Sequence, residues 1–115
     1  MAELRVKRVY AEAAAGDGLR VLVDRLWPRG VSKQRAALDH WLKEVAPSHK
    51  LRREFHAGML SFADFAARYR EELEGNAAVE ELRGLMEGAE VVTLLYGVKD
   101  EEENHALVLR DFLAH

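Results

Sequence analysis

Two short runs of apolar residues limit what this chain can fold into more than any other feature. They are LRVLVD at residues 19–24 and VVTLLY at residues 91–96. Apolar runs of about four to eight residues between turn signals are typical of strands buried on both faces, as in a parallel sheet covered by helices. The segment from Leu4 to Tyr10 predicts a further strand. We therefore expect an α/β fold: one small domain over residues 1–115, with a mostly parallel central sheet of about three to four strands flanked by helices.

Helical patterns fill most of the chain between these strands. Ser48, Ser61 and Asn76 each precede an apolar stripe, and all three are residue types that cap helix N-termini. Gly75 and Gly88 follow two of the stripes, where a glycine commonly ends a helix. These signals predict three consecutive helices between residue 48 and the second apolar run.

The segment from residue 38 to residue 46 supports two interpretations. Its apolar residues Leu38, Trp41, Leu42 and Val45 follow the helical spacing i, i+3, i+4, i+7. Pro47 follows directly, and the residue before a proline avoids the α conformation, so an extended segment is the alternative. We favour the helix.

The composition excludes several classes of function. The chain has 17 Lys and Arg, 20 Asp and Glu and a net charge of −3, whereas proteins that grip a phosphate backbone are usually basic. The absence of cysteine excludes disulfides, thiolate chemistry and cysteine-ligated metals, and the histidines form no set with metal-ligand spacing. The charged N-terminal segment and the shortness of the longest apolar run, VVTLLYGV, predict a cytoplasmic protein without a membrane partner.

The first candidate ligand site follows the strand at residues 19–24 and precedes a helical turn. In open α/β sheets, ligands bind beyond the carboxyl ends of the strands. This stretch contains Arg25, Arg29 and Lys33, whose cationic groups suit a phosphate or a carboxylate. Asp24 is a candidate base or a residue that orients an arginine, and Trp27 is a candidate for stacking on a planar ligand.

The second candidate segment follows the strand at residues 91–96. If the two strands are parallel neighbours, this loop lies beside the first one. Lys99 would add positive charge there, and Tyr96 a hydroxyl. Asp100 is either a carboxylate for acid–base chemistry or the N-cap of a last helix, which we expect from about Glu101 to Leu113, and the two roles are compatible.

Structural roles compete with these functional ones. Trp27 is favoured as a core residue over a stacking residue. Asp24 and Arg25 also fit a structural ion pair, although such a pair leaves the other basic residues unexplained. Ser48 is most simply a helix cap, with a ligand-facing hydroxyl as the alternative. His105 is expected on ordinary solvated surface.

Motifs along nearly the whole chain resemble one known family. The most specific is DRLWPRG at residues 24–30, and weaker ones are Ala46-Pro47-Ser48, Phe55-His56, Thr93-Leu94-Leu95-Tyr96, Lys99-Asp100 and Asn104-His105-Ala106. Together they resemble the YeaO-like family, which is the domain-of-unknown-function family 488. The resemblance implies a small stand-alone protein without an established activity. The chain departs from the family pattern at Ala57-Gly58, where Asp-Pro is usual, and at Glu103, where a histidine is usual.

The positions that match the family pattern are rich in polar side chains, and Arg52 and Asn104 join the candidate site for that reason. The candidate catalytic residues are Asp24, Tyr96 and Asp100. The candidate ligand-binding residues are Arg25, Trp27, Arg29, Lys33, Ser48, Arg52, Lys99 and Asn104.

These residues predict a binder of, or an enzyme acting on, a small anionic ligand at the carboxyl ends of the central strands. The alternative is a nucleic-acid-binding or processing protein, possibly a regulatory one, in which the basic groups follow a backbone. A protein-interaction module is a third hypothesis, favoured if Trp27 lies in an exposed apolar patch. No cofactor, reaction type or oligomeric state follows from the sequence.

Overall fold

The central element of the computed structural model, which describes residues 2–114, is a four-stranded sheet. Its strands are β1 (Glu3–Arg8), β2 (Leu19–Leu22), β3 (His40–Trp41) and β4 (Val91–Tyr96). They lie in the order β1-β4-β2-β3, and each neighbouring pair is parallel. The predicted α/β fold with a mostly parallel sheet is therefore confirmed.

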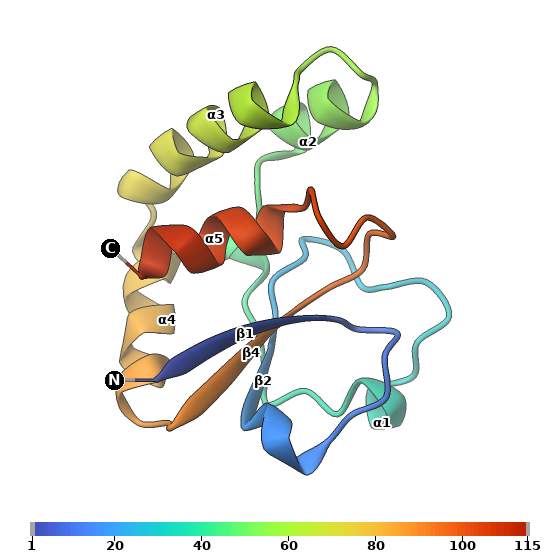
Figure 1. Ribbon diagram of the computed structural model, residues 1–115, viewed down its shortest axis with the longest axis vertical. Helices are drawn as coiled ribbons and strands as arrows, with labels where there is room; N and C mark the ends of the chain where they lie inside the picture. Colours follow the sequence, from blue (N-terminus) through green and yellow to red (C-terminus); the bar gives the residue numbers. More distant parts are fainter. Residues whose placement is uncertain (1, 115) are drawn as a thin grey trace.

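Helices surround this sheet (Figure 1). They are α1 (Lys33–Ala36), α2 (His49–His56), α3 (Phe62–Glu74), α4 (Ala77–Glu87) and α5 (His105–Leu113), with 3₁₀ turns η1 (Ala15–Asp17) and η2 (Lys43–Val45). The predicted caps are confirmed, because the side-chain oxygens of Ser48, Ser61 and Asn76 accept hydrogen bonds from first-turn amides of α2, α3 and α4. No helix within residues 2–114 has the length and apolar character needed to cross a bilayer.

The segment from residue 38 to residue 46 is not the helix that its spacing favours. It forms β3, which pairs with β2, and then η2. The amide of Asp39 donates to the carbonyl of Arg20 at 2.8 Å, and the amide of Leu42 donates to the carbonyl of Leu22 at 3.0 Å. Pairing with the sheet thus satisfies the backbone in an extended form, and this tertiary contact overrides the helical periodicity.

The last helix begins later than predicted. α5 starts at His105, and its cap is Asn104, whose side-chain oxygen accepts a hydrogen bond from a first-turn amide at 3.0 Å. Asp100 instead closes a separate turn, in which Oδ1 accepts from the amides of Glu102 and Glu103 at 2.9 and 3.0 Å. Residues 101–104 therefore belong to the loop after β4, and the start of α5 lies at the edge of the sheet.

The two faces of the sheet bury separate apolar clusters. Val21 and Leu94 belong to the cluster covered by α2 to α5, whereas Leu22 and Leu95 belong to the cluster covered by α1 and the segment before β3. Successive strand residues point to opposite faces, so neighbouring residues fall in different clusters. The runs LRVLVD and VVTLLY are mostly apolar because both faces of the sheet are covered.

The two candidate segments lie side by side, as expected. β2 and β4 are parallel neighbours, with Leu22 opposite Leu95. The amide of Val23 extends this pairing by donating to the carbonyl of Leu95 at 3.0 Å. Parallel strands end at the same edge of a sheet, and both loops start from that edge.

A buried ion cluster ties the turn before β2 to the sheet. The carboxylate of Asp17 pairs with the guanidinium of Arg20 and lies 3.1 Å from Nζ of Lys7, and its backbone oxygen accepts from the hydroxyl of Thr93 at 2.7 Å. Burial raises the pKa of Asp17, but a hydrogen bond from the Ala14 amide and the two cations outweigh burial and hold the pKa below its ordinary value of 3.8.

Replacing Asp17 with Asn tests this cluster. The Arg20 residue is only 5% exposed, so Asp17→Asn leaves its charge buried without a counter-ion. We expect the free energy of unfolding to fall by about 3 kcal/mol, measured by urea denaturation. Glu87→Gln, on the exposed surface of α4, is the control, and a loss below about 0.5 kcal/mol for Asp17→Asn would contradict this role.

Candidate functional site

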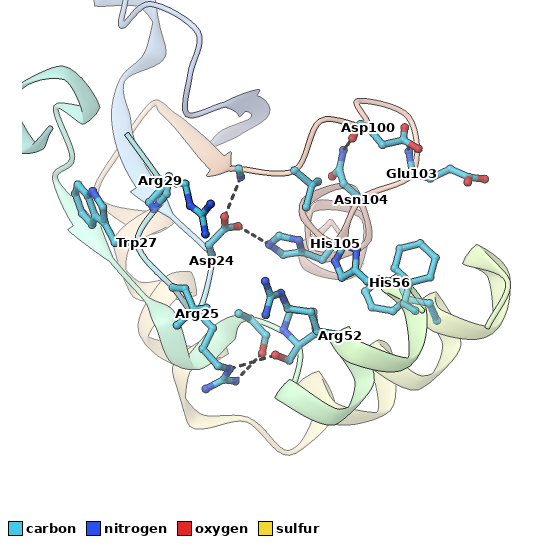
Figure 2. A pocket seen from close by; sticks show the side chains of 18 of the residues that line it. Asp24, Arg25, Trp27, Arg29, Arg52, His56, Asp100, Glu103, Asn104 and His105 are labelled. Carbon is cyan, nitrogen blue, oxygen red and sulfur yellow. Dashed lines mark hydrogen bonds and ion pairs between the residues drawn. The ribbon is translucent and has the colours of Figure 1, made fainter. Parts of the chain in front are cut away.

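A cleft of about 530 Å³ opens at the carboxyl edge of β2 and β4. It is lined by segment 24–29 after β2, by residues of segment 97–105 after β4, by residues 46–47, and by side chains of α2 and α3. Figure 2 shows side chains from these separate segments converging on one space. A concavity of this volume is typical of a small-molecule site. The two candidate segments thus form walls of the same cleft.

Asp24 is the residue on which the walls of the cleft meet. One carboxylate oxygen, Oδ2, accepts a hydrogen bond from the amide of Gly97 at 2.9 Å, and the other, Oδ1, lies 3.0 Å from Nε2 of His105. The backbone oxygen of Asp24 accepts from the indole of Trp41 at 2.8 Å. A Cβ atom at position 97 would lie 2.9 Å from Oδ2, so glycine permits this close approach. One side chain thereby joins the loops after β2 and β4 to the start of α5.

The same contact sets the hydrogen-bonding pattern of the His105 ring. Nε2 lies 3.0 Å from Asp24 Oδ1 and 3.1 Å from the carbonyl oxygen of Val23. Both oxygens are acceptors, so the neutral ring carries its hydrogen on Nε2. The hydrogen bond is made to the carbonyl of Val23, and Oδ1 is the one buried side-chain nitrogen or oxygen in residues 2–114 that has no hydrogen-bond partner. Nδ1 has no hydrogen-bond partner in that part of the chain, and the ring lines the cleft.

Arg25 lines the cleft but also has a structural role. Its guanidinium donates to the carbonyl of Pro47 at 3.2 Å and to that of Ala46 at 3.0 Å, and it lies 3.7 Å from the carboxylate of Glu44. Figure 2 shows it turned toward these carbonyls. The ion pair considered between Asp24 and Arg25 is therefore replaced by two others, Asp24 with His105 and Arg25 with Glu44.

Arg29 and Arg52 line the cleft without a partner. Neither guanidinium forms a hydrogen bond or an ion pair within residues 2–114. Arg29 comes from the loop after β2, and Arg52 comes from α2. A guanidinium presents five N–H donors and keeps its charge at all ordinary pH values, so two such groups in one cleft are suited to an anion.

Trp27 combines packing with a place in the cleft wall. Its indole donates to the carbonyl of Val31 at 2.7 Å, and its ring packs edge-on against Trp41 with centroids 5.4 Å apart. It is partly buried beside the apolar cluster on the α1 side of the sheet. Tyr10 lines the same wall, and its hydroxyl donates to the carbonyl of Arg29 at 2.8 Å. The favoured role of Trp27 as a core residue agrees with these contacts.

Two predicted residues lie on the wall formed by the loop before α5. Asp100 lines the cleft, and hydrogen bonds from the amides of Glu102 and Glu103 hold the pKa of its carboxyl below the ordinary 3.8. Asn104 is 1% exposed; besides capping α5, its side chain donates to the carbonyl of Asp100 at 2.9 Å. The hydrogen bonds of both side chains therefore fix the shape of this loop, which forms one wall of the cleft.

Four predicted site residues do not line the cleft. Lys33 and Lys99 are exposed, and Ser48 caps α2 while its hydroxyl donates to Glu72 at 2.7 Å. Tyr96 is 3% exposed in the core, and burial raises the pKa of its hydroxyl, with a further rise from the Glu101 carboxylate. The cationic groups that do line the cleft thus come from the loop after β2 and from α2.

Sequence reasoning missed three polar residues of the cleft, His56, Glu103 and His105. The expectation of a solvated His105 is wrong, because its side chain is 11% exposed and contacts Asp24. The available signal was the family pattern, which includes both Phe55-His56 and Asn104-His105. Among residues 2–114, no group of three or more His, Asp and Glu side chains is placed to hold a metal ion.

His56 lies in a positive environment. The pKa of its ring is below the ordinary 6.5 because partial burial disfavours the charged form, and because Arg52 and His105 add positive charge nearby. His56 is therefore mostly neutral at neutral pH. This part of the cleft disfavours a further positive charge and favours a negative one.

The fold and the cleft define a small α/β protein with a ligand-sized concavity at the carboxyl edge of a parallel sheet. Comparison with known proteins then identifies the family. A family model described as "Inactive DUF488-N3 subclade" matches residues 3–115. The chain belongs to the YeaO-like DUF488 family, which confirms the resemblance found in the sequence.

Relatives match this chain over almost its whole length. Uncharacterized protein YeaO of Escherichia coli strain K12 is 44% identical over 110 residues, which is 96% of each chain. Uncharacterized protein Rv3073c of Mycobacterium tuberculosis strain H37Rv and uncharacterized protein Mb3100c of Mycobacterium bovis are each 44% identical over 110 residues, covering 96% of this chain and 92% of their own. No solved structure gives a significant match.

The geometry around Asp24 predicts the tautomer of His105. Because both oxygens beside Nε2 are acceptors, the neutral ring carries its hydrogen on Nε2 and leaves Nδ1 unprotonated. A long-range proton–nitrogen NMR spectrum of the ring, assigned with a His105→Gln variant, measures this directly. A neutral ring with its hydrogen on Nδ1 would contradict the geometry.

Proposed function

We propose that this protein binds a small anionic ligand in the cleft between segments 24–29 and 97–105. The observation that carries the proposal is the pair of guanidinium groups, Arg29 and Arg52, which line the cleft without a counter-ion in residues 2–114. The carboxylate of Asp24 is engaged by Gly97 and His105 and does not neutralise them. A phosphate or carboxylate would supply the missing acceptors.

The apolar part of the lining indicates that this ligand also has an apolar body. Phe55 and Phe65 line the cleft and stack on each other with centroids 4.4 Å apart. Pro47 and Val98 add further apolar surface. Small-molecule sites commonly combine such walls with a few fixed polar groups. A planar or hydrocarbon body with one or two anionic groups fits this lining.

Several observations favour binding over turnover. Asp24, the predicted base, holds the Gly97 amide through Oδ2 and lies beside the His105 ring through Oδ1, so it has a structural role in the cleft wall. Tyr96, the predicted hydroxyl donor, is buried away from the cleft. The matching family model is described as an inactive subclade, and that description supports a binding role.

Nucleic-acid binding is the less favoured candidate. The net charge of −3 opposes long-range attraction of such a backbone. We also propose a cytoplasmic location, which the absence of cysteine supports.

A matched pair of arginine variants tests the proposal. Arg52 and its neighbour Arg53 are both exposed residues of α2, but only Arg52 lines the cleft. With adenosine 5′-monophosphate and inorganic phosphate as probes, we expect Arg52→Gln to weaken binding by about tenfold or more, because a charge-assisted contact is lost. Arg53→Gln should stay within about twofold of the wild type. Isothermal titration calorimetry measures both.

Two outcomes would overturn the proposal. One is the absence of binding for both phosphate probes and for citrate as a carboxylate probe. The other is an equal loss of affinity in the two variants, which would indicate nonspecific attraction to α2. Strongly salt-dependent binding of oligonucleotides without binding of the small probes would favour the nucleic-acid alternative.

A further inference from the structure

One wall of the cleft brings together three groups that can carry positive charge. Arg52 and His56 lie one helical turn apart on α2, and His105 is the first residue of α5. Figure 2 shows the side chains of His56 and His105 next to each other in the lining of the cleft. The charges of Arg52 and His105 both disfavour a proton on His56, so the three groups interact electrostatically. The fold therefore holds together side chains that repel one another when protonated, and an anion would relieve that repulsion.

The nearest carboxylate does not fill this place. Asp24 accepts from the Gly97 amide through Oδ2 and contacts Nε2 of His105 through Oδ1. Nδ1 lies on the opposite side of the imidazole from this contact and has no partner within residues 2–114. Asp24 thus lies beside Nε2 and leaves Nδ1, an acceptor in the neutral ring, facing the cleft, while Asp24 itself does not neutralise Arg52 or His56.

We infer, building on the proposed function, that Arg52 and His56 form the subsite for the ligand's oxyanion on the wall that they share with His105, and that the anion binds together with one proton. The ligand class is one with a tetrahedral oxyanion, such as a phosphate or sulfate group. Arg52 supplies a permanent charge and a fork of donors. His56 takes its proton from the solvent when the anion arrives, and the charged ring then donates from both nitrogens. No covalent bond to the ligand forms or breaks.

Other charged groups also line the cleft and bear on how anion binding affects protonation of His56. Arg25 and Arg29 stand on the loop after β2 beside Asp24, and Asp100 and Glu103 stand on the loop before α5. The pKa of His56 lies below 6.5 because partial burial, Arg52 and His105 all disfavour its charged form. A bound anion adds the missing negative charge and raises that pKa. Affinity for the anion must therefore rise as the pH falls through the pKa of His56.

NMR titration of the histidine rings tests this inference at the level of single residues. The pKa of His56 is measured in about 10 mM sulfate and in chloride of equal ionic strength, because sulfate itself does not titrate in this range. We expect sulfate to raise the pKa of His56 by about 0.5 or more, which corresponds to an affinity gain of roughly threefold or more on protonation. His40 and His49 do not line the cleft, and their ring signals serve as internal references. Arg52→Gln should remove most of the effect, and Arg53→Gln should retain it.

The outcomes separate this inference from the proposed function. An unchanged pKa of His56 in sulfate, or equal movement of the His40 and His49 signals, would overturn the subsite. If adenosine 5′-monophosphate binds by calorimetry while His56 does not respond to it or to sulfate, the inference fails and the proposed function stands. If neither probe binds, both fail. A response confined to His56 and dependent on Arg52 would support both.

Discussion

The carboxylate of Asp24 makes two contacts that the sheet alone would not produce. Its two oxygens reach the amide of Gly97 and the ring of His105, so the loops after β2 and β4 and the start of α5 are held at fixed distances. The approach depends on glycine at position 97, where any Cβ would collide with the carboxylate. A charged acceptor shared by a backbone amide and an imidazole is stronger than a neutral hydrogen bond, and it is largely shielded from water here. The shape of the cleft follows from this one side chain.

The chemistry of the site depends on the charged side chains of the cleft that have no partner within residues 2–114. Arg25 is occupied with the carbonyls of residues 46–47, and it fixes the entrance to α2 against the loop after β2. With Asp24 and Arg25 engaged in structure, Arg29 and Arg52 remain as cations without counter-ions, and His56 remains as a neutral ring between charges. The guanidinium groups of Arg29 and Arg52 are therefore available to a ligand, which supports binding as the role of the cleft.

The sequence predicts the framework well, because the framework rests on local patterns. LRVLVD and VVTLLY are recognisable as strands covered on both faces, and parallel neighbours necessarily send their loops to one edge. The structure of segment 38–46 could not be predicted in this way. Its apolar spacing fits a helix, and the pattern does not show that β2 has a free edge with which β3 can pair. Tyr96 was misplaced for a simpler reason: it shares a strand face with Leu94 and so points into the core. His56 and His105 were missed because the spacing of residues within a helix does not reveal which loop the helix packs against.

The claim that Asp24 and His105 jointly hold the cleft together is tested most directly by a double-mutant cycle. The free energies of unfolding of the wild type, Asp24→Asn, His105→Gln and the double variant are measured by urea denaturation. The account predicts a coupling energy of about 1 kcal/mol or more, because each single variant removes the same buried contact. A coupling energy within about 0.3 kcal/mol of zero would contradict it, since the two side chains would then contribute independently.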